Sequence, residues 1–239
     1  MNDTNSMYFF SEIAKSFLYP QIFDNLEHVW EALKTKEEIL SGLKTSINRG
    51  KVDQTVIIRG PVFIGVNTVI EPYTVIDGPI IIGSNCYIRP NVYLRKGSII
   101  SNNVVIGHGV EVKNSLIFSE CKLDSHSFVG DSILGRGVRN GTGTVTANRR
   151  FDQQDISVKI KDVKTQTGFD KFGCVIGDYS RVGANCTILP GTLIGAHVWV
   201  YPHLEINSFI QSKKLVKSKD EIVDKSDLVL SSTDKKGEL

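Results

Sequence analysis

Aliphatic side chains recur at every sixth position along most of this chain. Ten consecutive positions at that spacing, from Ile58 to Val112, are all Ile, Leu or Val. If about a quarter of the residues in an average chain are of these types, chance gives such a run on the order of once in a million. A second run of six positions extends from Ile176 to Ile206. A period of six fits neither a helix of 3.6 residues per turn nor the simple alternation of a strand.

The repeat predicts an all-β solenoid, a left-handed parallel β-helix of hexapeptide repeats. Each hexad would supply one short strand, with its aliphatic residue pointing into the axis, and one corner. Three hexads, about 18 residues, would complete one triangular coil. Glycine follows several of the aliphatic positions, and glycine accepts corner conformations that branched residues resist. These glycines are Gly65, Gly83, Gly107, Gly177 and Gly195.

The repeat is interrupted twice, and its ends differ from its middle. The phase shifts between Val112 and Leu134, and residues 149–174 lose the period altogether, which predicts a loop that leaves the coil. Long loops in compact scaffolds often carry function. Helical spacing near the N-terminus predicts helices that cap the open first coil, since solenoids need capped ends. The expected regions are an N-terminal helical cap (residues 1–50), a β-helix (51–211) and a polar C-terminal tail (212–239).

Charge and cysteine usage restrict the partners. The 239 residues include 28 Lys and Arg against 26 Asp and Glu, a net charge of +2, which favours neither nucleic acid nor a membrane surface as the main partner. No apolar run reaches about 18 residues, so no membrane span is expected. No basic start precedes an apolar core, so no signal peptide is expected either. The 4 cysteines form no C-x-x-C pair, which favours reduced thiols and a cytoplasmic protein.

Five longer strings stand out from the bare repeat. They are YIRPNVYL, VEVKNS, SFVGDSILG, GTGTVTANRRFD and VIGDYSRVGANCTILPGTLIG. Together they resemble the hexapeptide acyltransferase superfamily, and in particular the C-terminal acetyltransferase domain of archaeal-type bifunctional sugar-1-phosphate nucleotidylyltransferase/acetyltransferases. No glycine-rich nucleotide loop follows an N-terminal strand, so nucleotidyl transfer is not implied. The resemblance implies acetyl-CoA as acyl donor and a homotrimer with active sites between subunits.

The matched motifs imply which side chains meet a sugar phosphate. Arg89 in YIRP and Lys113 in VEVK correspond to the family's sugar-phosphate ligands, and their charge and donor geometry suit a phosphate. Asn148 in TAN corresponds to an asparagine that contacts the sugar and the acetyl region. Arg149, Arg150 and Lys159, on the long loop, could add to the anion site. The alternative for each residue is a solvated corner or loop position.

The catalytic base is where the chain departs from the family. Acetyl transfer to an amine needs a base for the ammonium proton, and the family places a histidine six residues before the Asp of its V-G-D string. That position is Ser125, and His126 follows it. Histidine is the natural base near neutral pH, but a one-residue shift in an extended chain reverses the face of a side chain. Either the phase shift turns His126 outward and restores the base, or Ser125, Asp124 or water takes over, or catalysis is absent.

Two further departures affect specificity and stability. Phe128 replaces the family's usual tyrosine in the substrate site, which removes a hydroxyl group. Asn140 places a polar side chain where the core expects an apolar one. The acceptor is therefore expected to differ even where the acyl transfer is retained.

The last coils match the groove that holds the pantetheine of CoA. The resemblance assigns Ala184 and the pair Tyr201 and Pro202 to that groove. Lys213 follows the last coil and could meet CoA phosphates or be part of a charged tail.

No metal site is expected. The string IGHG at His108 resembles γ-type carbonic anhydrases, which share this fold. Zinc would need a second histidine about five residues later, and that residue is Lys113. The four distant cysteines offer no alternative zinc site.

We therefore expect an acetyl-CoA-dependent N-acetyltransferase that acts on a small-molecule amino sugar, such as glucosamine 1-phosphate or a nucleotide-linked amino sugar. An alternative is a catalytically inactive trimeric β-helix that serves as a structural or ligand-sensing subunit. A third is an acyltransferase with a different acceptor.

Overall fold

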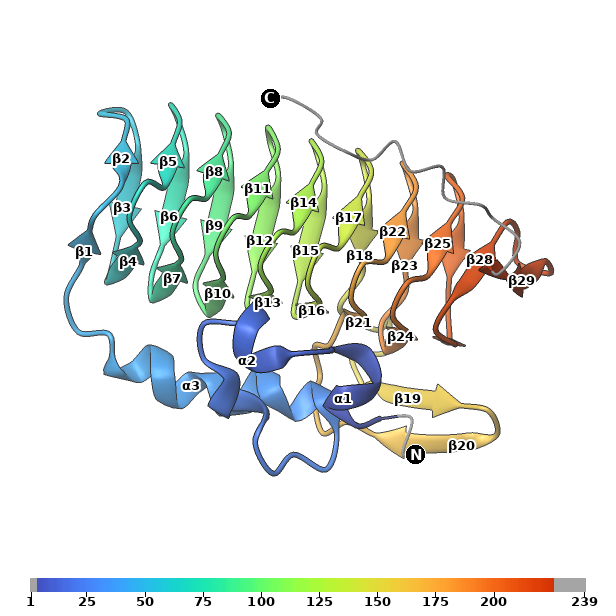
Figure 1. Ribbon diagram of the computed structural model, residues 1–239. Helices are drawn as coiled ribbons and strands as arrows, with labels where there is room; N and C mark the ends of the chain where they lie inside the picture. Colours follow the sequence, from blue (N-terminus) through green and yellow to red (C-terminus); the bar gives the residue numbers. More distant parts are fainter. Residues whose placement is uncertain (1–3, 226–239) are drawn as a thin grey trace.

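The computed structural model describes residues 4–225 and consists of a three-sided coil with helices along one side (Figure 1). Short strands stack in three sheets over about nine turns, and the predicted left-handed parallel β-helix is confirmed. Where the hexad is unbroken, strands of neighbouring coils pair 18 residues apart, as Ile81 does with Ile99.

Each side of the coil is one sheet, named A, B or C in the order in which the chain visits them. Sheet A contains β1 (Ile47–Asn48), β4 (Val62–Ile64), β7 (Ile80–Ile82), β10 (Ser98–Ile100), β13 (Leu116–Ile117), β16 (Ile133–Leu134), β21 (Cys174–Ile176), β24 (Thr192–Ile194) and β27 (Phe209–Ile210). Sheet B contains β2 (Lys51–Val52), β5 (Val69–Ile70), β8 (Tyr87–Ile88), β11 (Val105–Ile106), β14 (Lys122–Leu123), β17 (Arg139–Asn140), β22 (Arg181–Val182), β25 (Trp199–Val200), β28 (Lys214–Val216) and β29 (Ile222–Asp224). Sheet C contains β3 (Ile57–Arg59), β6 (Val75–Asp77), β9 (Tyr93–Arg95), β12 (Glu111–Lys113), β15 (Phe128–Gly130), β18 (Val145–Thr146), β23 (Thr187–Ile188) and β26 (Glu205–Ile206).

The hexad residues form the coil axis. Every hexad position from Ile64 to Val112 is buried and belongs to one continuous aliphatic cluster. Ile58 remains 38% exposed because it lies in the first coil, beyond which the described chain places no further coil. Burial of these stacked side chains from water is the main force that holds the coil together.

The phase shifts are one-residue deletions at two corners between sheet C and sheet A. Ile99 pairs with Leu116, and Leu116 with Ile133, so that each step is 17 residues instead of 18. The shortened corners contain Asn114 and Asp131, whose φ angles are 50° and 48°. Asn and Asp tolerate this left-handed conformation better than other side chains do.

The N-terminal helices do not close the first coil, which corrects the expectation of an end cap. They are α1 (Ser6–Phe9), α2 (Ile13–Ser16) and α3 (Ala32–Gly42), with 3-10 turns η1 (Pro20–Phe23) and η2 (Val29–Glu31). They lie along the outer face of sheet A (Figure 1). That face carries apolar side chains such as Ile99 and Leu116, and a sheet that is apolar on both faces needs a cover. Phe118 packs between Phe10 and Phe17, with ring centroids 4.6 Å from each.

The expected loop leaves the coil after β18 and returns at β21. It contains an antiparallel hairpin of β19 (Ser157–Ile160) and β20 (Val163–Gln166). Ile156, Val158 and Phe172 anchor this loop in the apolar cluster beneath the N-terminal helices. The loop is therefore a packed extension of the cover on sheet A.

The coil extends to Val216, beyond the boundary expected at residue 211, and β29 then pairs with β28 in antiparallel fashion. Residues 226–239 of the expected tail lie outside the described residues. Within residues 4–225, no helix has the length and apolar character that a membrane crossing requires.

Candidate functional site

Most of the predicted site residues lie on two opposite edges of sheet C. The edge where the chain passes from sheet B to sheet C, called the B–C edge, carries Arg89, Ser125, His126, Ala184, Tyr201 and Pro202. The edge where it passes from sheet C to sheet A, called the C–A edge, carries Lys113, Asn148 and Arg149. About five residues of extended chain, roughly 16 Å, separate the two edges.

Two predicted residues lie away from both edges. Lys159 is in the hairpin strand β19, and Lys213 is on the third edge, between β27 and β28. Phe128 stands on the outer side of sheet C, and its ring covers Gly130: a Cβ atom added to that glycine would lie 2.6 Å from the ring. The same added atom would lie 3.0 Å from the amide nitrogen of Asn148. The Phe128 ring therefore points toward the C–A edge.

His126 is exposed on the B–C edge, with a φ angle of 57°. Its backbone N–H donates to the His108 carbonyl at 2.9 Å, and the two imidazole rings meet edge to face at 5.1 Å. A Cβ atom on Gly109, in the coil before, would lie 2.8 Å from His126 Nδ1. The glycine therefore leaves room for the imidazole, which points away from the coil axis.

The corners beyond His126 on the B–C edge are rich in glycine. The next corner is Gly141-Thr142-Gly143, and the one after it begins with Gly183. A Cβ atom on Gly183 would lie 2.4 Å from the nitrogen of Pro202, so the coils approach closely there. Three coils at about 4.8 Å each place Tyr201 roughly 14 Å from His126 along the edge.

Asp131 is the centre of the C–A edge. Its Oδ2 accepts from Lys113 Nζ at 2.9 Å and from Asn148 Nδ2, and its Oδ1 accepts from Asn114 Nδ2 at 2.6 Å. The Asp131 side chain is 4% exposed, while that of Lys113 is 21% exposed. The buried carboxylate thus holds the lysine and the amide in place and leaves part of the ammonium open to solvent.

A pocket of about 410 Å³ opens beside this cluster. Its charged side chains are Glu37, Lys96, Lys113, Asp131, Asp170 and Lys171, and Pro79, Gly97, Asn114 and Phe169 complete the lining. Three ammonium groups and three carboxylates around one pocket suit a ligand that carries charges of both signs.

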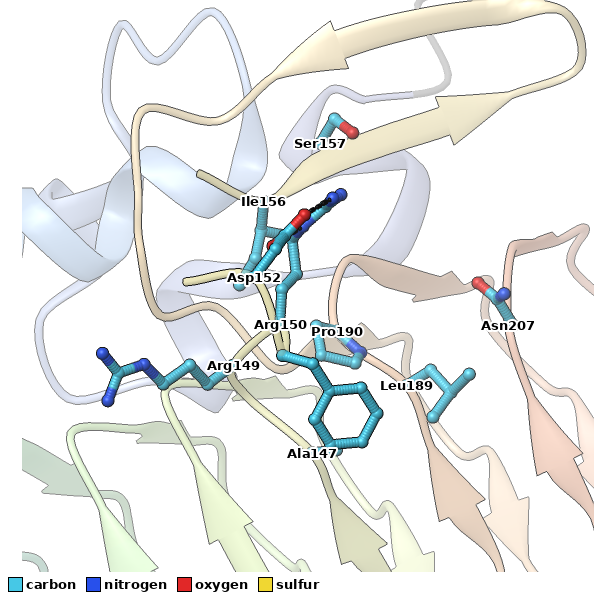
Figure 2. Close-up of a pocket in the computed structure, with 10 residues that line it drawn as sticks. Ala147, Arg149, Arg150, Asp152, Ile156, Ser157, Leu189, Pro190 and Asn207 are labelled. Atoms are coloured by element: carbon cyan, nitrogen blue, oxygen red, sulfur yellow. Dashed lines mark hydrogen bonds and ion pairs between the residues drawn. The ribbon is translucent and has the colours of Figure 1, made fainter. Parts of the chain in front are cut away.

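A second groove, of about 630 Å³, runs between the root of the long loop and the last coils (Figure 2). Arg150 forms a two-point ion pair with Asp152, which holds the pKa of the Asp152 carboxyl low, at about 2. Arg149 donates to Gln153 at 2.9 Å and points away from that pair (Figure 2). Phe151, fully exposed, leaves an aromatic ring on the rim of the groove.

Asn114 and Phe151 were not apparent as site residues from the sequence, and Asp131 served only to locate the V-G-D string. The signal for Asp131 and Asn114 was the phase shift itself. A shortened corner needs a residue that tolerates positive φ, and an acid or amide at that corner faces its neighbours in the next coil.

Three further findings concern the acids, thiols and axial residues of the described range. No group of three or more His, Cys, Asp or Glu side chains in this range is arranged to hold a metal ion. All four cysteines are free and buried, and burial raises the pKa of the Cys174 thiol to about 12. Asn140 lies in the coil axis, and its Oδ1 has no hydrogen-bond partner among the described residues.

Residues 76–170 match the family described as the GMPPB C-terminal domain. The bifunctional protein GlmU of Methanococcus aeolicus is 38% identical over 197 residues, which cover 82% of this chain and 47% of that protein. The bifunctional sugar-1-phosphate nucleotidylyltransferase/acetyltransferase of Sulfurisphaera tokodaii is 39% identical over 178 residues, which cover 74% of this chain and 44% of that protein. The chain thus spans about half the length of the curated relatives it matches.

Among solved structures, the UDP-N-acetylglucosamine acyltransferase of Francisella novicida has a TM-score of 0.50 at 14% identity, over 74% of this chain and 66% of that one. The class of protein is therefore a hexapeptide-repeat β-helix. The predicted resemblance to the bifunctional sugar-1-phosphate nucleotidylyltransferase/acetyltransferases is confirmed.

Proposed function

We propose that this protein is an acyltransferase that moves an acetyl group from acetyl-CoA to the amine of a phosphorylated or nucleotide-linked amino sugar, for instance glucosamine 1-phosphate. The observation that carries this proposal is the Lys113–Asp131–Asn148 cluster beside a pocket lined by lysines and carboxylates. An amino-sugar phosphate carries an ammonium and a phosphate, which match the two kinds of charge. The names of the relatives support the reaction class.

In the proposed reaction two protons leave the sugar nitrogen. The sugar ammonium first loses one proton to solvent. The neutral amine then attacks the thioester carbonyl and gives its second proton to His126, and a C–N bond forms as the C–S bond breaks. The imidazolium then returns its proton to the departing thiolate, so that CoA leaves as a thiol. The outward imidazole of His126 is free to approach a substrate on the B–C edge.

Acetyl-CoA would lie along the B–C edge. The corner Gly141-Thr142-Gly143 offers backbone groups that its two glycines leave uncovered, and Ala184 and Tyr201 follow on the same line. A strip roughly 14 Å long between His126 and Tyr201 suits an extended pantetheine arm. Arg89, two coils before His126 on this edge, would face the phosphate of the acceptor.

The site would be completed between two copies of the chain. His126 and Lys113 lie on opposite edges of one protomer, so one molecule cannot present both to a single sugar. In a homotrimer, the B–C edge of one protomer can face the C–A edge of the next. This arrangement would bring the proposed base, Arg89, Lys113 and Asn148 around one acceptor.

One observation favours the alternative of an inactive subunit. Asn140 Oδ1 is buried in the axis without a partner in the described chain, a costly feature beside the coils proposed to hold the substrates.

The test is release of free CoA thiol from acetyl-CoA, with glucosamine 1-phosphate, glucosamine and N-acetylglucosamine 1-phosphate as matched acceptors. We expect thiol release with the first, weaker release with the second and none with the third. No release with any amino sugar or nucleotide-linked amino sugar would support the inactive subunit.

A further inference from the structure

A fully buried lysine of the N-terminal helices reaches the candidate site. Lys36 lies in α3, with its side chain 0% exposed. Its ammonium donates to Asn114 Oδ1 at 2.6 Å and to Glu37 Oε1 at 3.0 Å. Burial lowers the pKa of Lys36, because the charged form loses its hydration. An apolar residue would cover sheet A without that cost.

The amide of Asn114 has one orientation in this arrangement. Its oxygen accepts from Lys36, so its nitrogen is the group that donates to Asp131 Oδ1 at 2.6 Å. The space around that oxygen is restricted as well, since a Cβ atom on Gly97 would lie 2.6 Å from it. Asp131 in turn binds Lys113 and Asn148 through its other oxygen.

We propose that Lys36 is a positioning residue for the substrate site. It fixes the Asn114 amide, which holds the Asp131 carboxylate in the rotamer that presents Lys113 and Asn148 to the acceptor. The identity of the acceptor rests on the proposed function. The chain of contacts assigns a role in substrate binding to helices that the sequence suggested were only a cap.

The alternative is a purely structural role, in which Lys36 only satisfies the amide oxygen of the half-buried Asn114. The two roles differ in what they predict for kinetics. A structural lysine would change the stability of the fold and the number of active molecules, which lowers kcat. A positioning lysine would raise KM for the phosphorylated acceptor and leave KM for acetyl-CoA unchanged.

The test compares Lys36→Met with Lys34→Met, an exposed position on the same helix. We expect Lys36→Met to raise KM for glucosamine 1-phosphate about tenfold, with less than about a twofold change for acetyl-CoA, and Lys34→Met to resemble the wild type. Asn114→Gly removes the amide without backbone strain, because glycine accepts a φ of 50°. It also keeps the inference testable if Lys36→Met fails to fold.

The double variant Lys36→Met/Asn114→Gly should be no worse than either single variant, because both interrupt the same path. Additive effects, or a lower kcat at unchanged KM, would overturn the positioning role.

A second readout does not depend on turnover. Limited acetylation by acetic anhydride, followed by peptide mass spectrometry, reports how firmly Lys113 is held by Asp131. We expect Lys113 to be labelled several-fold faster in Lys36→Met than in the wild type or in Lys34→Met. Equal labelling would contradict the inference about Lys36. Faster labelling in a protein that acetylates no amino sugar would retain this inference and reject the proposed function.

Discussion

The ammonium of Lys113 lies 2.9 Å from the carboxylate of Asp131, which stands in the next coil at a corner one residue shorter than the corners of the regular repeat. The carboxylate is almost fully buried, and it also accepts hydrogen bonds from Asn114 and Asn148. Three hydrogen bonds hold this buried carboxylate in one orientation. The carboxylate in turn fixes the positions of the three side chains that donate to it.

Replacement of Asp131 by alanine should therefore affect both stability and binding. We expect Asp131→Ala to lower the free energy of unfolding by about 3 kcal/mol, because three half-buried donors lose the charged group to which they donate. KM for the acceptor should rise as well. Urea unfolding followed by circular dichroism measures the first effect. Arg59→Ala, which removes an exposed partner of Asp77, is the matched control, with an expected loss below about 1 kcal/mol. Equal losses in the two variants would contradict the central role of Asp131.

Replacement of His126 tests the proposed base. The substitution His126→Asn keeps a residue that tolerates the φ angle of 57°. We expect kcat to fall about a hundredfold or more, with little change in the thermal unfolding midpoint. His203→Asn is the matched control, because His203 has a φ angle of 60° on the same edge. Unchanged turnover in His126→Asn would show that another group takes the proton.

The fold was predictable because the hexad encodes it directly. Each aliphatic position from Ile64 to Val112 is buried where the repeat places it. The corners were less predictable, because a phase shift reports a missing residue but not where in the corner it is lost. The deletions proved to be at Asn114 and Asp131, and they create the cluster that holds Lys113.

The position of the N-terminal helices could not be derived from helical periodicity. The apolar spacing shows that one face of a helix is covered, but not which surface covers it. The signal was present elsewhere, since sheet A strands such as β7 (Ile80–Ile82) are apolar at every residue. Lys36 was also visible in principle, as a lysine between Leu33 and Leu40 on the buried face of α3.

Gly97 should be required for the Asn114 amide. Its φ angle is 89°, and an added Cβ would meet Asn114 Oδ1 at 2.6 Å. We expect Gly97→Ala to lower the free energy of unfolding by about 1–3 kcal/mol. Gly42→Ala has no neighbour within 4 Å and should be neutral or slightly stabilising. Urea unfolding of the two variants decides this, and similar values would contradict the packing described for Asn114.

Two phenylalanines, one buried and one exposed, should respond differently to substitution. Phe118 is fully buried between Phe10 and Phe17, whereas Phe151 is fully exposed. We expect Phe118→Ala to lower the free energy of unfolding by about 3–5 kcal/mol and Phe151→Ala to leave it unchanged. If Phe151 lines an acyl-donor site, Phe151→Ala should raise KM for acetyl-CoA alone. A large loss of stability in Phe151→Ala would instead place this ring in an interface between protomers.

The buried lysine should give the protein a distinctive pH dependence. Burial lowers the folded-state pKa of Lys36, so the unfolded chain binds more protons over the interval between that pKa and the ordinary value of about 10.4. Stability from this group therefore rises as pH increases through that interval. We expect the stability of the wild type relative to Lys36→Met to increase toward pH 10 in thermal unfolding. Parallel pH profiles for the two proteins would show that folding does not lower the pKa of Lys36.

Complementation between two inactive variants, His126→Asn and Lys113→Met, tests directly whether the site is shared between protomers. The variants are unfolded together, refolded as a mixture and assayed for thiol release from acetyl-CoA with glucosamine 1-phosphate. If each site takes His126 from one protomer and Lys113 from the next, random mixing leaves about a quarter of the sites intact, and about a quarter of the wild-type activity should return. No recovery in a mixture of refolded oligomers, beside an active wild type, would contradict a site shared between the two edges of sheet C.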